Sequence, residues 1–288
     1  MASRRLLLVH AHPDDETITT GATMAFYAAH DVDVTLLTCT LGEEGEILVP
    51  ELARLRANCT DQLGGYRIGE LAAAMRELGV TDHRFLGGAG HFRDSGMLGS
   101  PANNHPRALW RADLERAVFA EAVAAAAEVI ADVRPQVVVT YDPRGGYGHP
   151  DHVLAHRVTT AAVSAVAERW AVDKLYWTVL PESEIAAGNA AARAAGTAFE
   201  LRKPGRTPGV VPDRAVTAVV DASEYVAAKR AALQAHATQV SVDGEVYALS
   251  NGIGRRISGV EHYRLAAGTA GERGADGLEH DLFAGIAP

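Results

Sequence analysis

The sequence predicts an α/β fold: a Rossmann-like open sheet, mostly parallel, with helices on both faces and a less regular C-terminal part. Short apolar, β-branched runs alternate with segments of helical spacing, which is typical of βαβ units. Two of these runs end in strongly polar turns, and the length of 288 residues suits one large α/β domain. We expect residues 1–170 to form the catalytic core. Residues 171–288 would complete the sheet and the cleft, in the same domain or as a small appendage.

The first strand is expected over residues 4–10, and it runs into the segment HAHPDDE at 10–16. Pro13 stops the strand because proline has no N–H for the ladder. Residues 17–30 then carry apolar side chains at helical spacing. The polar segment therefore lies between the carboxyl end of a strand and the start of a helix, where open α/β sheets bind ligands.

The next elements continue the alternation. They are a strand over 32–40, helical segments over 51–63 and 67–78 broken by Gly64 and Gly65, a strand over 84–87, a long Ala-rich helix over 111–133 and a strand over 135–141. Gly79 is a plausible helix stop. Glu43, Glu44 and Glu46 are expected in a solvated acidic loop. The stretch 87–107, rich in Gly, Asn, Pro and Ser, is a long loop of the kind that is functional or disordered.

A second polar turn, DPRGGYGHPDH at 142–152, follows the strand over 135–141 and precedes a helix over about 153–169. It shares the tripeptide His-Pro-Asp with the first turn, at 149–151 and 12–14. If the two strands are neighbours, the two turns face each other across one cleft.

The C-terminal third gives a weaker pattern. The expected elements are strands over 174–180, 216–220 and 262–267 and helices over 182–195 and 224–239. The last twenty residues, rich in glycine, are expected to fray.

Composition excludes several function classes. The formal charge is −9, with 27 basic and 36 acidic residues and no basic cluster, which argues against nucleic acid as a partner. The two cysteines cannot form a disulfide framework. We expect no signal segment and no membrane span, because the apolar runs are too short, and therefore a cytoplasmic protein. The sequence leaves the oligomeric state open.

The residue types in the two turns suit a catalytic metal, which takes three His, Asp or Glu ligands and leaves a position for water. His12 and Asp15, three residues apart around one turn, can close on one ion, and His152 can supply the third ligand. Asp14 then remains as a general base beside the bound water, whose pKa zinc lowers to roughly 7. Fe²⁺ would suit the same ligands.

His149 is left at the opposite rim. As an imidazolium it could stabilise an oxyanion or protonate a leaving amine, and the neighbouring Asp151 could hold it charged. These parts fit hydrolysis of an amide by metal-activated water. His10, which alternates with His12, is expected to pack or hydrogen-bond behind the site.

A lone histidine at a strand end is more often structural than a ligand, but four histidines beside aspartates in two equivalent turns favour a metal site. A dinucleotide-binding fingerprint is missing, since Arg93 stands where GxGxxG needs glycine. The nucleophile elbow GxSxG is also missing.

HPDDE at 12–16 with GHPDH at 148–152 resembles the LmbE-like zinc deacetylases, which include the N-acetylglucosaminyl-phosphatidylinositol deacetylases. Longer segments are similar to the branch of this family that acts in mycothiol biosynthesis in actinobacteria. They are TCTLGEEGE at 38–46, DQLGGYRIGEL at 61–71, LGGAG at 86–90, RDSGM at 93–97 and VVVTYDPRGGYGHPDH at 137–152.

The resemblance implies one Zn²⁺ per subunit on His12, Asp15 and His152, with Asp14 as general base and His149 stabilising the oxyanion. It also implies the following roles: a mobile tyrosine at Tyr147, and contacts from Arg67 and Asp94 to the sugar and inositol hydroxyls. The implied substrate is N-acetylglucosaminyl-inositol, cut to glucosaminyl-inositol and acetate. Without the resemblance, these last three residues would be a packing aromatic, a helix-surface charge and a turn residue.

Three alternatives remain. A mycothiol S-conjugate amidase of the same family shares the chemistry, but its pattern has Lys where this chain has Thr19. A non-catalytic sugar- or nucleotide-binding α/β module would not need the unligated Asp14. A phosphate-ester hydrolase would favour a two-metal, carboxylate-rich site.

Overall fold

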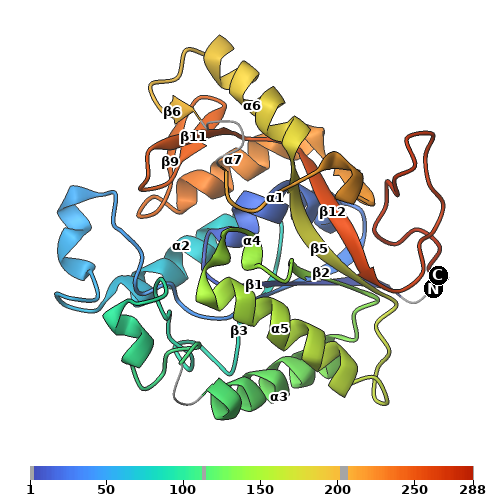
Figure 1. The fold of residues 1–288 in the computed structure, drawn as a ribbon, viewed down its shortest axis with the longest axis horizontal. Helices are drawn as coiled ribbons and strands as arrows, with labels where there is room; N and C mark the ends of the chain where they lie inside the picture. Colours follow the sequence, from blue (N-terminus) through green and yellow to red (C-terminus); the bar gives the residue numbers. More distant parts are fainter. Residues whose placement is uncertain (1–2, 112–114, 202–206, 288) are drawn as a thin grey trace.

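The computed structural model describes residues 3–111, 115–201 and 207–287, and its centre is one mixed sheet (Figure 1). The strands of this sheet are β1 (Arg4–His10), β2 (Val32–Thr38), β3 (Asp82–Phe85), β4 (Val137–Tyr141), β5 (Lys174–Pro181), β7 (Val210–Val211), β8 (Ala218–Asp221) and β12 (Val260–Ala267). The order is β3-β2-β1-β4-β5-β12-β8, with β7 pairing to β5. The strands from β3 to β5 are parallel, and β12 is antiparallel to both neighbours. The predicted fold class is confirmed.

Strands β1 and β4 are parallel neighbours, in a register that pairs Leu6 with Val137 and Leu8 with Val139. The chain order of the strands reverses between them, which makes this pair the topological switch point of the sheet. The two polar turns that follow β1 and β4 therefore meet at one edge, as the repeated His-Pro-Asp predicted.

Helices cover both faces of the sheet, which explains why β1 is apolar on successive residues rather than on alternate ones. The helices are α1 (Asp15–Ala29), α2 (Leu63–Glu77), α3 (Glu115–Val133), α4 (Gly145–Gly148), α5 (Pro150–Ala165), α6 (Glu182–Ala194) and α7 (Val226–Ala235). Leu6 and Leu8 belong to the core under α1, α2 and α7, whereas Leu7 and Val9 belong to the core under α3 and α5. Within the described part of the chain, no helix is long and apolar enough to cross a membrane.

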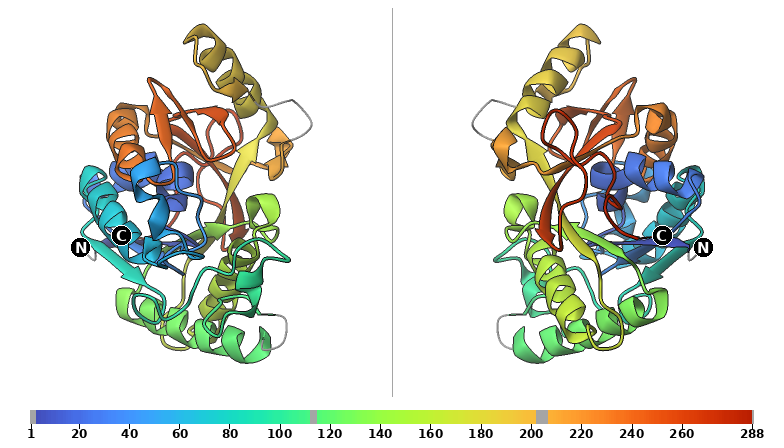
Figure 2. Two further views of the ribbon diagram at one scale, coloured as in Figure 1. Left: turned by 90° about the vertical axis from the view of Figure 1, so that its left-hand side faces the viewer. Right: turned by 90° about the vertical axis from the view of Figure 1, so that its right-hand side faces the viewer.

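The C-terminal third adds to the main sheet and builds a second, small sheet above its carboxyl edge. The small sheet has the order β6-β11-β10-β9, formed by β6 (Glu200–Leu201), β9 (Ser241–Asp243), β10 (Val246–Ala248) and β11 (Ile253–Arg256). Helix α6 projects away from the body of the molecule beside this sheet (Figure 2). The division of the chain at residue 170 stays a prediction.

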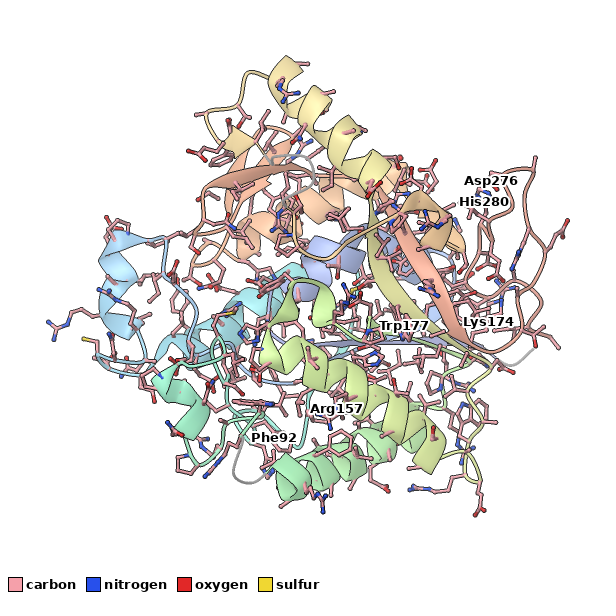
Figure 3. The ribbon with its side chains drawn as sticks, in the orientation of Figure 1. Phe92, Arg157, Lys174, Trp177, Asp276 and His280 are labelled. Carbon is pink, nitrogen blue, oxygen red and sulfur yellow. The ribbon has the colours of Figure 1, made fainter. Side chains whose placement is uncertain are left out.

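The C-terminal segment is anchored at the opposite edge of the sheet. Lys174 lies at the start of β5 (Figure 3). Its Nζ donates to Glu279 Oε1 at 2.6 Å, and Tyr176 donates to Glu279 Oε2 at 2.9 Å. Glu279 also lies beside β8, where its carbonyl accepts from the N–H of Val219. A buried carboxylate with these partners holds the tail in place, so the predicted fraying of the last twenty residues is wrong for their described part.

Two predictions around residues 51–67 are wrong. Only Pro50–Leu55 is helical in the first segment, as a 3₁₀ helix, and Gly64 and Gly65 lie inside α2. A Cβ on Gly64 would stand 2.7 Å from Glu43 Cγ and 2.9 Å from Leu41 Cβ. Glycine at this position lets α2 approach the loop that follows β2. The small sheet was not predicted, because its strands are only two to four residues long.

The contact at Gly64 gives a stability prediction. We expect Gly64→Ala to lower the free energy of unfolding by about 1–3 kcal/mol, because the added methyl overpacks the contact with the loop. The matched control is Gly65→Ala, whose Cβ meets nothing within 4 Å and which should stabilise α2 by about 0.5–1 kcal/mol. Urea unfolding measures both, and equal effects of the two substitutions would contradict the close approach.

Candidate functional site

Three donor atoms converge where the turns after β1 and β4 meet. Asp15 Oδ2 lies 3.4 Å from His12 Nδ1 and 3.2 Å from His152 Nε2. In a tetrahedral site the distance between neighbouring donors is about 1.6 times the bond length, so zinc bonds of about 2.0–2.2 Å place donors about 3.3–3.6 Å apart. Both distances suit neighbouring ligands of one tetrahedral metal ion, with the Asp15 carboxylate between the two histidines.

His152 gives independent support for an ion. Its Nε2 atom is buried and makes no hydrogen bond among the described residues, although Asp15 Oδ2 lies 3.2 Å away. A buried polar atom in that state is costly unless it binds something. The ring stacks on Tyr141, with centroids 4.4 Å apart and planes 27° apart. The tyrosine hydroxyl in turn accepts from the N–H of Ala11 at 2.9 Å. The imidazole is thus held with its free nitrogen toward His12 and Asp15.

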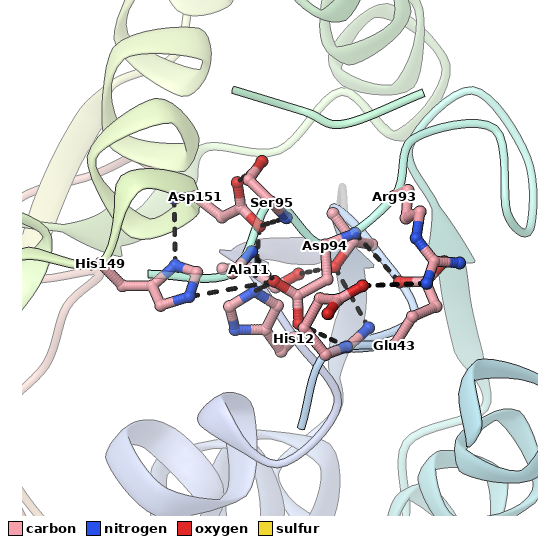
Figure 4. Close-up of polar contacts among 12 residues, drawn as sticks. Ala11, His12, Glu43, Arg93, Asp94, Ser95, His149 and Asp151 are labelled. Carbon is pink, nitrogen blue, oxygen red and sulfur yellow. Dashed lines mark hydrogen bonds and ion pairs between the residues drawn. The ribbon is translucent and has the colours of Figure 1, made fainter. Parts of the chain in front are cut away.

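Asp151 orients His12 rather than His149. His12 Nε2 donates to Asp151 Oδ2 at 3.2 Å (Figure 4). This leaves Nδ1 to face Asp15. The same carboxylate accepts from the backbone N–H of Ser95 at 2.9 Å and from its hydroxyl at 2.5 Å. A carboxylate behind a ligating histidine is the usual arrangement at metal sites. The prediction that Asp151 would hold His149 charged is wrong, because its oxygens are engaged elsewhere.

His149 is arranged to act as a neutral donor. Its Nδ1 accepts from the N–H of Asp151 at 3.1 Å, as the cap of α5, so the ring proton lies on Nε2. Burial, together with His12 and His152, lowers the pKa of His149 to about 3. The predicted imidazolium is therefore not the form that this environment favours. His12, His149 and His152 also form a nitrogen cluster compact enough for one ion, with ligand atoms within 4.8 Å of one another.

Asp14 stands beside the three donors in an unusual backbone conformation. Its φ of 118° and ψ of −34° lie in a region that residues with a side chain rarely adopt, and such outliers gather at functional sites. Its Oδ2 lies 3.0 Å from Arg67 Nη2. Burial raises the pKa of Asp14 to about 6, partly offset by the Arg67 guanidinium. A carboxylate with this pKa suits a general base near neutral pH.

Arg67 and Asp94, the expected substrate contacts, both line the cavity over the donors. Arg67 is buried, and besides Asp14 it donates to the carbonyls of Pro13 and Gly42. Asp94 Oδ1 accepts from Gly96 N at 2.8 Å and lies 3.5 Å from His12 Nε2. Both side chains are therefore built into the walls of the site, and their contacts with substrate stay predictions.

The acidic loop after β2 is not simply solvated. Glu43 is buried, and its Oε2 accepts from the N–H of Asp94 at 3.0 Å. Glu44 accepts from Arg93 at 2.9 Å, and the same arginine pairs with Asp61 at 2.7 Å. These contacts tie the loop to the segment that carries Asp94 and Ser95. Of the three glutamates, only Glu46 lines the cavity without a contact of this kind among the described residues.

The cavity has a volume of about 810 Å³, within the range of ligand sites. Tyr147 lies at its edge, half exposed, with its ring centroid 4.9 Å from that of His152. Its turn can sit this close because Gly145 lacks a Cβ, which would stand 2.6 Å from His152 Cβ. Much of the remaining wall comes from the C-terminal third, through segments 178–189, 239–262 and 207–209.

A model of the PIG-L family, described as GlcNAc-PI de-N-acetylase, matches residues 7–163, which is more than half of the chain. The chain belongs to this family. The matched region contains both polar turns, and with them His12, Asp15 and His152. The predicted family resemblance is confirmed.

Curated relatives match the PIG-L chain over almost its whole length. The protein named 1D-myo-inositol 2-acetamido-2-deoxy-alpha-D-glucopyranoside deacetylase in Acidothermus cellulolyticus is 60% identical over 98% of this chain and 95% of its own. The protein of the same name in Geodermatophilus obscurus is 56% identical over 99% of this chain and 98% of its own. The similarity therefore includes the C-terminal third, which lies beyond the family segments quoted above.

Solved structures share the fold at low identity. A zinc-inhibited form of the teicoplanin deacetylase Orf2 has a TM-score of 0.54 at 18% identity, over 92% of this chain and all of its own. The 4-carboxy-2-hydroxymuconate hydratase GalB of Pseudomonas putida has a TM-score of 0.58 at 17% identity, over 94% of this chain and all of its own. Because a deacetylase and a hydratase share this fold, the fold alone does not specify the reaction.

Several residues of this PIG-L site were not predicted. Tyr141 and Ser95 fix His152 and Asp151, and Glu16 forms a buried pair with His236 from the C-terminal third. Tyr141 and Ser95 stand next to the polar turn and within the RDSGM segment, so their positions carried a weak signal. His236 lies in a helical pattern that gives no indication of its partner. His10 packs behind the site as predicted, with its Nε2 3.0 Å from Thr20 Oγ1.

The donor geometry predicts which histidine of α5 binds the ion. His152→Ala should lose stoichiometric zinc, because it removes one of three converging donors. His156→Ala is the matched control, one turn further along α5, where Nδ1 lies 3.0 Å from the carbonyl of Tyr141. Metal analysis after zinc loading and desalting tests this. Zinc retained at one equivalent in His152→Ala would remove that residue from the ligand set.

Proposed function

We propose that this chain is a zinc-dependent N-deacetylase that hydrolyses N-acetylglucosaminyl-inositol to glucosaminyl-inositol and acetate, the deacetylation step of mycothiol biosynthesis. The observation that carries the proposal is the carboxylate of Asp14, which pairs with Arg67 and is left out of the donor set His12, Asp15 and His152. Relatives that match the chain from end to end bear the name of this deacetylase. The reaction would take place in the cytoplasm with one ion per subunit.

The proposed ligands are His12 Nδ1, Asp15 Oδ2 and His152 Nε2. The distances from Asp15 to the two histidines are those of neighbouring ligands around a tetrahedral ion. When bound, zinc would lower the pKa of a water molecule and polarise the acetamide carbonyl. Imidazole and carboxylate donors suit Fe²⁺ as well, so we propose zinc on the match of geometry and leave iron as the second candidate.

The protein's own groups then carry the proton transfers. Asp14 would accept a proton from the attacking water. Its pKa of about 6, raised by burial against the opposing effect of the Arg67 guanidinium, suits this role. His149 would donate its Nε2–H to the carbonyl oxygen as negative charge develops there. The proton held by Asp14 would pass to the amine nitrogen as the carbon–nitrogen bond breaks. The products are acetate and the free amine, so all atoms are accounted for.

Other cavity residues are proposed to hold the substrate. Tyr147, on the glycine turn at the edge of the cavity, would move with substrate and assist near the oxyanion. Arg67 and Asp94 would contact sugar and inositol hydroxyls with the polar atoms that their neighbours leave free. The mycothiol S-conjugate amidase is not favoured, because the full-length relatives carry the deacetylase name.

The proposed reaction is tested by amine and acetate release from N-acetylglucosaminyl-inositol. We expect turnover that a chelator abolishes and that one equivalent of zinc restores, because the hydrolysis depends on the metal. The comparison substrate is a mycothiol S-conjugate. Cleavage of the conjugate without turnover of N-acetylglucosaminyl-inositol would contradict the deacetylase and support the amidase. Activity that survives complete removal of the metal would contradict both.

The role of Asp14 gives a second prediction. Asp14→Asn should lower kcat by about 10²–10⁴-fold, the usual contribution of a general base, with zinc still bound at one equivalent. Metal analysis and steady-state rates are measured on the same preparation. A parallel fall in zinc content and rate would show that Asp14 holds the ion rather than the proton.

A further inference from the structure

A buried ion pair joins the C-terminal third of the chain to the HPDDE segment. His236, directly after α7, places its Nε2 2.9 Å from Oε1 of Glu16, which lies in the first turn of α1. Both side chains are completely buried. The two residues are 220 positions apart in the sequence, so the pair exists only in the finished fold.

Glu16 connects this pair to the backbone of Asp14. Its second oxygen, Oε2, accepts from the N–H of Asp14 at 2.9 Å. Its Oε1 also accepts from the Thr17 hydroxyl at 2.6 Å. The carboxylate is therefore fixed at both ends, with His236 and Thr17 on one oxygen and Asp14 on the other.

The N–H of Asp14 needs such a partner. Asp14 caps α1, and N–H groups at the start of a helix have no carbonyl of the same helix to bond. The residue also has a φ of 118°, which the surrounding structure must impose because an isolated chain avoids it. The direction of this peptide decides where the Asp14 carboxylate points between Arg67 and the metal donors. A small displacement of a reacting group is costly, since about 1 Å can lower a rate by about 10²-fold.

We propose that His236 is a positioning residue for the deacetylation: through Glu16 it holds the Asp14 peptide in its strained conformation and so keeps the base carboxylate in place. The inference rests on the proposed function, in which Asp14 is the base. His236 itself touches none of the reacting atoms.

Other contacts already dock the segment that carries His236. Thr238 donates to Glu70 of α2 through its N–H and its hydroxyl, at 2.8 and 2.7 Å. Lys229 of α7 pairs with Glu261 of β12 at 2.6 Å. Because these contacts hold α7 against the core, loss of the His236 donor should change the position of Asp14 before it changes the fold.

The test compares two substitutions of His236 in the zinc-loaded protein. His236→Leu keeps most of the volume but has no donor, and we expect kcat to fall by about 10²-fold with KM and zinc content unchanged. His236→Gln keeps an N–H donor near the position of Nε2 and should recover most of the loss. A purely structural role would lower stability without this difference between the two variants.

Tyr263→Phe is the matched control. The Tyr263 hydroxyl donates to Thr23 Oγ1 at 2.6 Å, so the substitution also removes a buried hydrogen bond between the C-terminal third and α1. Thr23 lies more than two turns along α1 from Asp14, and we expect a lower Tm with an unchanged kcat. Equal losses of kcat in Tyr263→Phe and His236→Leu would overturn the inference.

Crystal structures of the zinc-loaded wild type and His236→Leu give a readout that does not depend on the substrate. We expect Asp14 to leave its positive φ in the variant and to move from Arg67. If the wild type does not turn over N-acetylglucosaminyl-inositol, the proposed function fails, and these structures still decide the positioning role. An unchanged Asp14 in the variant, or a wild-type kcat, would overturn it.

Thr17→Val covers the case in which His236→Leu does not fold. It removes the second donor from Glu16 Oε1 while keeping the shape of the side chain. We expect a smaller loss of kcat, again without loss of zinc, and a fall of kcat in parallel with zinc content would overturn the inference.

Discussion

The parallel pairing of β1 with β4 is the constraint on which the rest of the site depends. The register of Leu6 with Val137 and Leu8 with Val139 brings the carboxyl ends of the two strands level. Each strand is then followed at once by a polar turn, so ligands from residues 12–15 and 149–152 meet without any long connection. The central strands can be paired this firmly because both of their faces are buried under helices.

Around this pairing, buried polar groups restrain one another. Asp151 fixes the direction of His12, Tyr141 fixes the plane of His152, and Ser95 holds Asp151. Together these contacts leave one ring nitrogen of His12 and one of His152 facing the carboxylate of Asp15. An arrangement of this kind is costly to bury unless it binds a charged or polar ligand, and the residues present suit a metal ion.

The sequence was sufficient for the parts of the fold that repeat a simple pattern. The strands before the two turns, the helices after them and the meeting of the turns all follow from apolar runs, Pro13 and the doubled His-Pro-Asp. It was insufficient where packing overrides local signals: Gly64 reads as a helix breaker, but it lies inside α2 because the loop after β2 needs the space. The partner of Asp151 could not be inferred either, since Ser95 reaches it from a loop whose path no periodicity describes.

The pair of His236 with Glu16 has a consequence for how the molecule is made. The donors at His12, Asp15 and His152 all leave the ribosome in the first part of synthesis, and β1 can already pair with β4 at that stage. Glu16 lacks its imidazole partner until residue 236 has emerged. Contacts across such a long stretch of chain form late and slow the folding of a domain. In a nascent chain the proposed metal ligands are therefore all present before Glu16 can gain its imidazole partner, and the last third of translation supplies that partner.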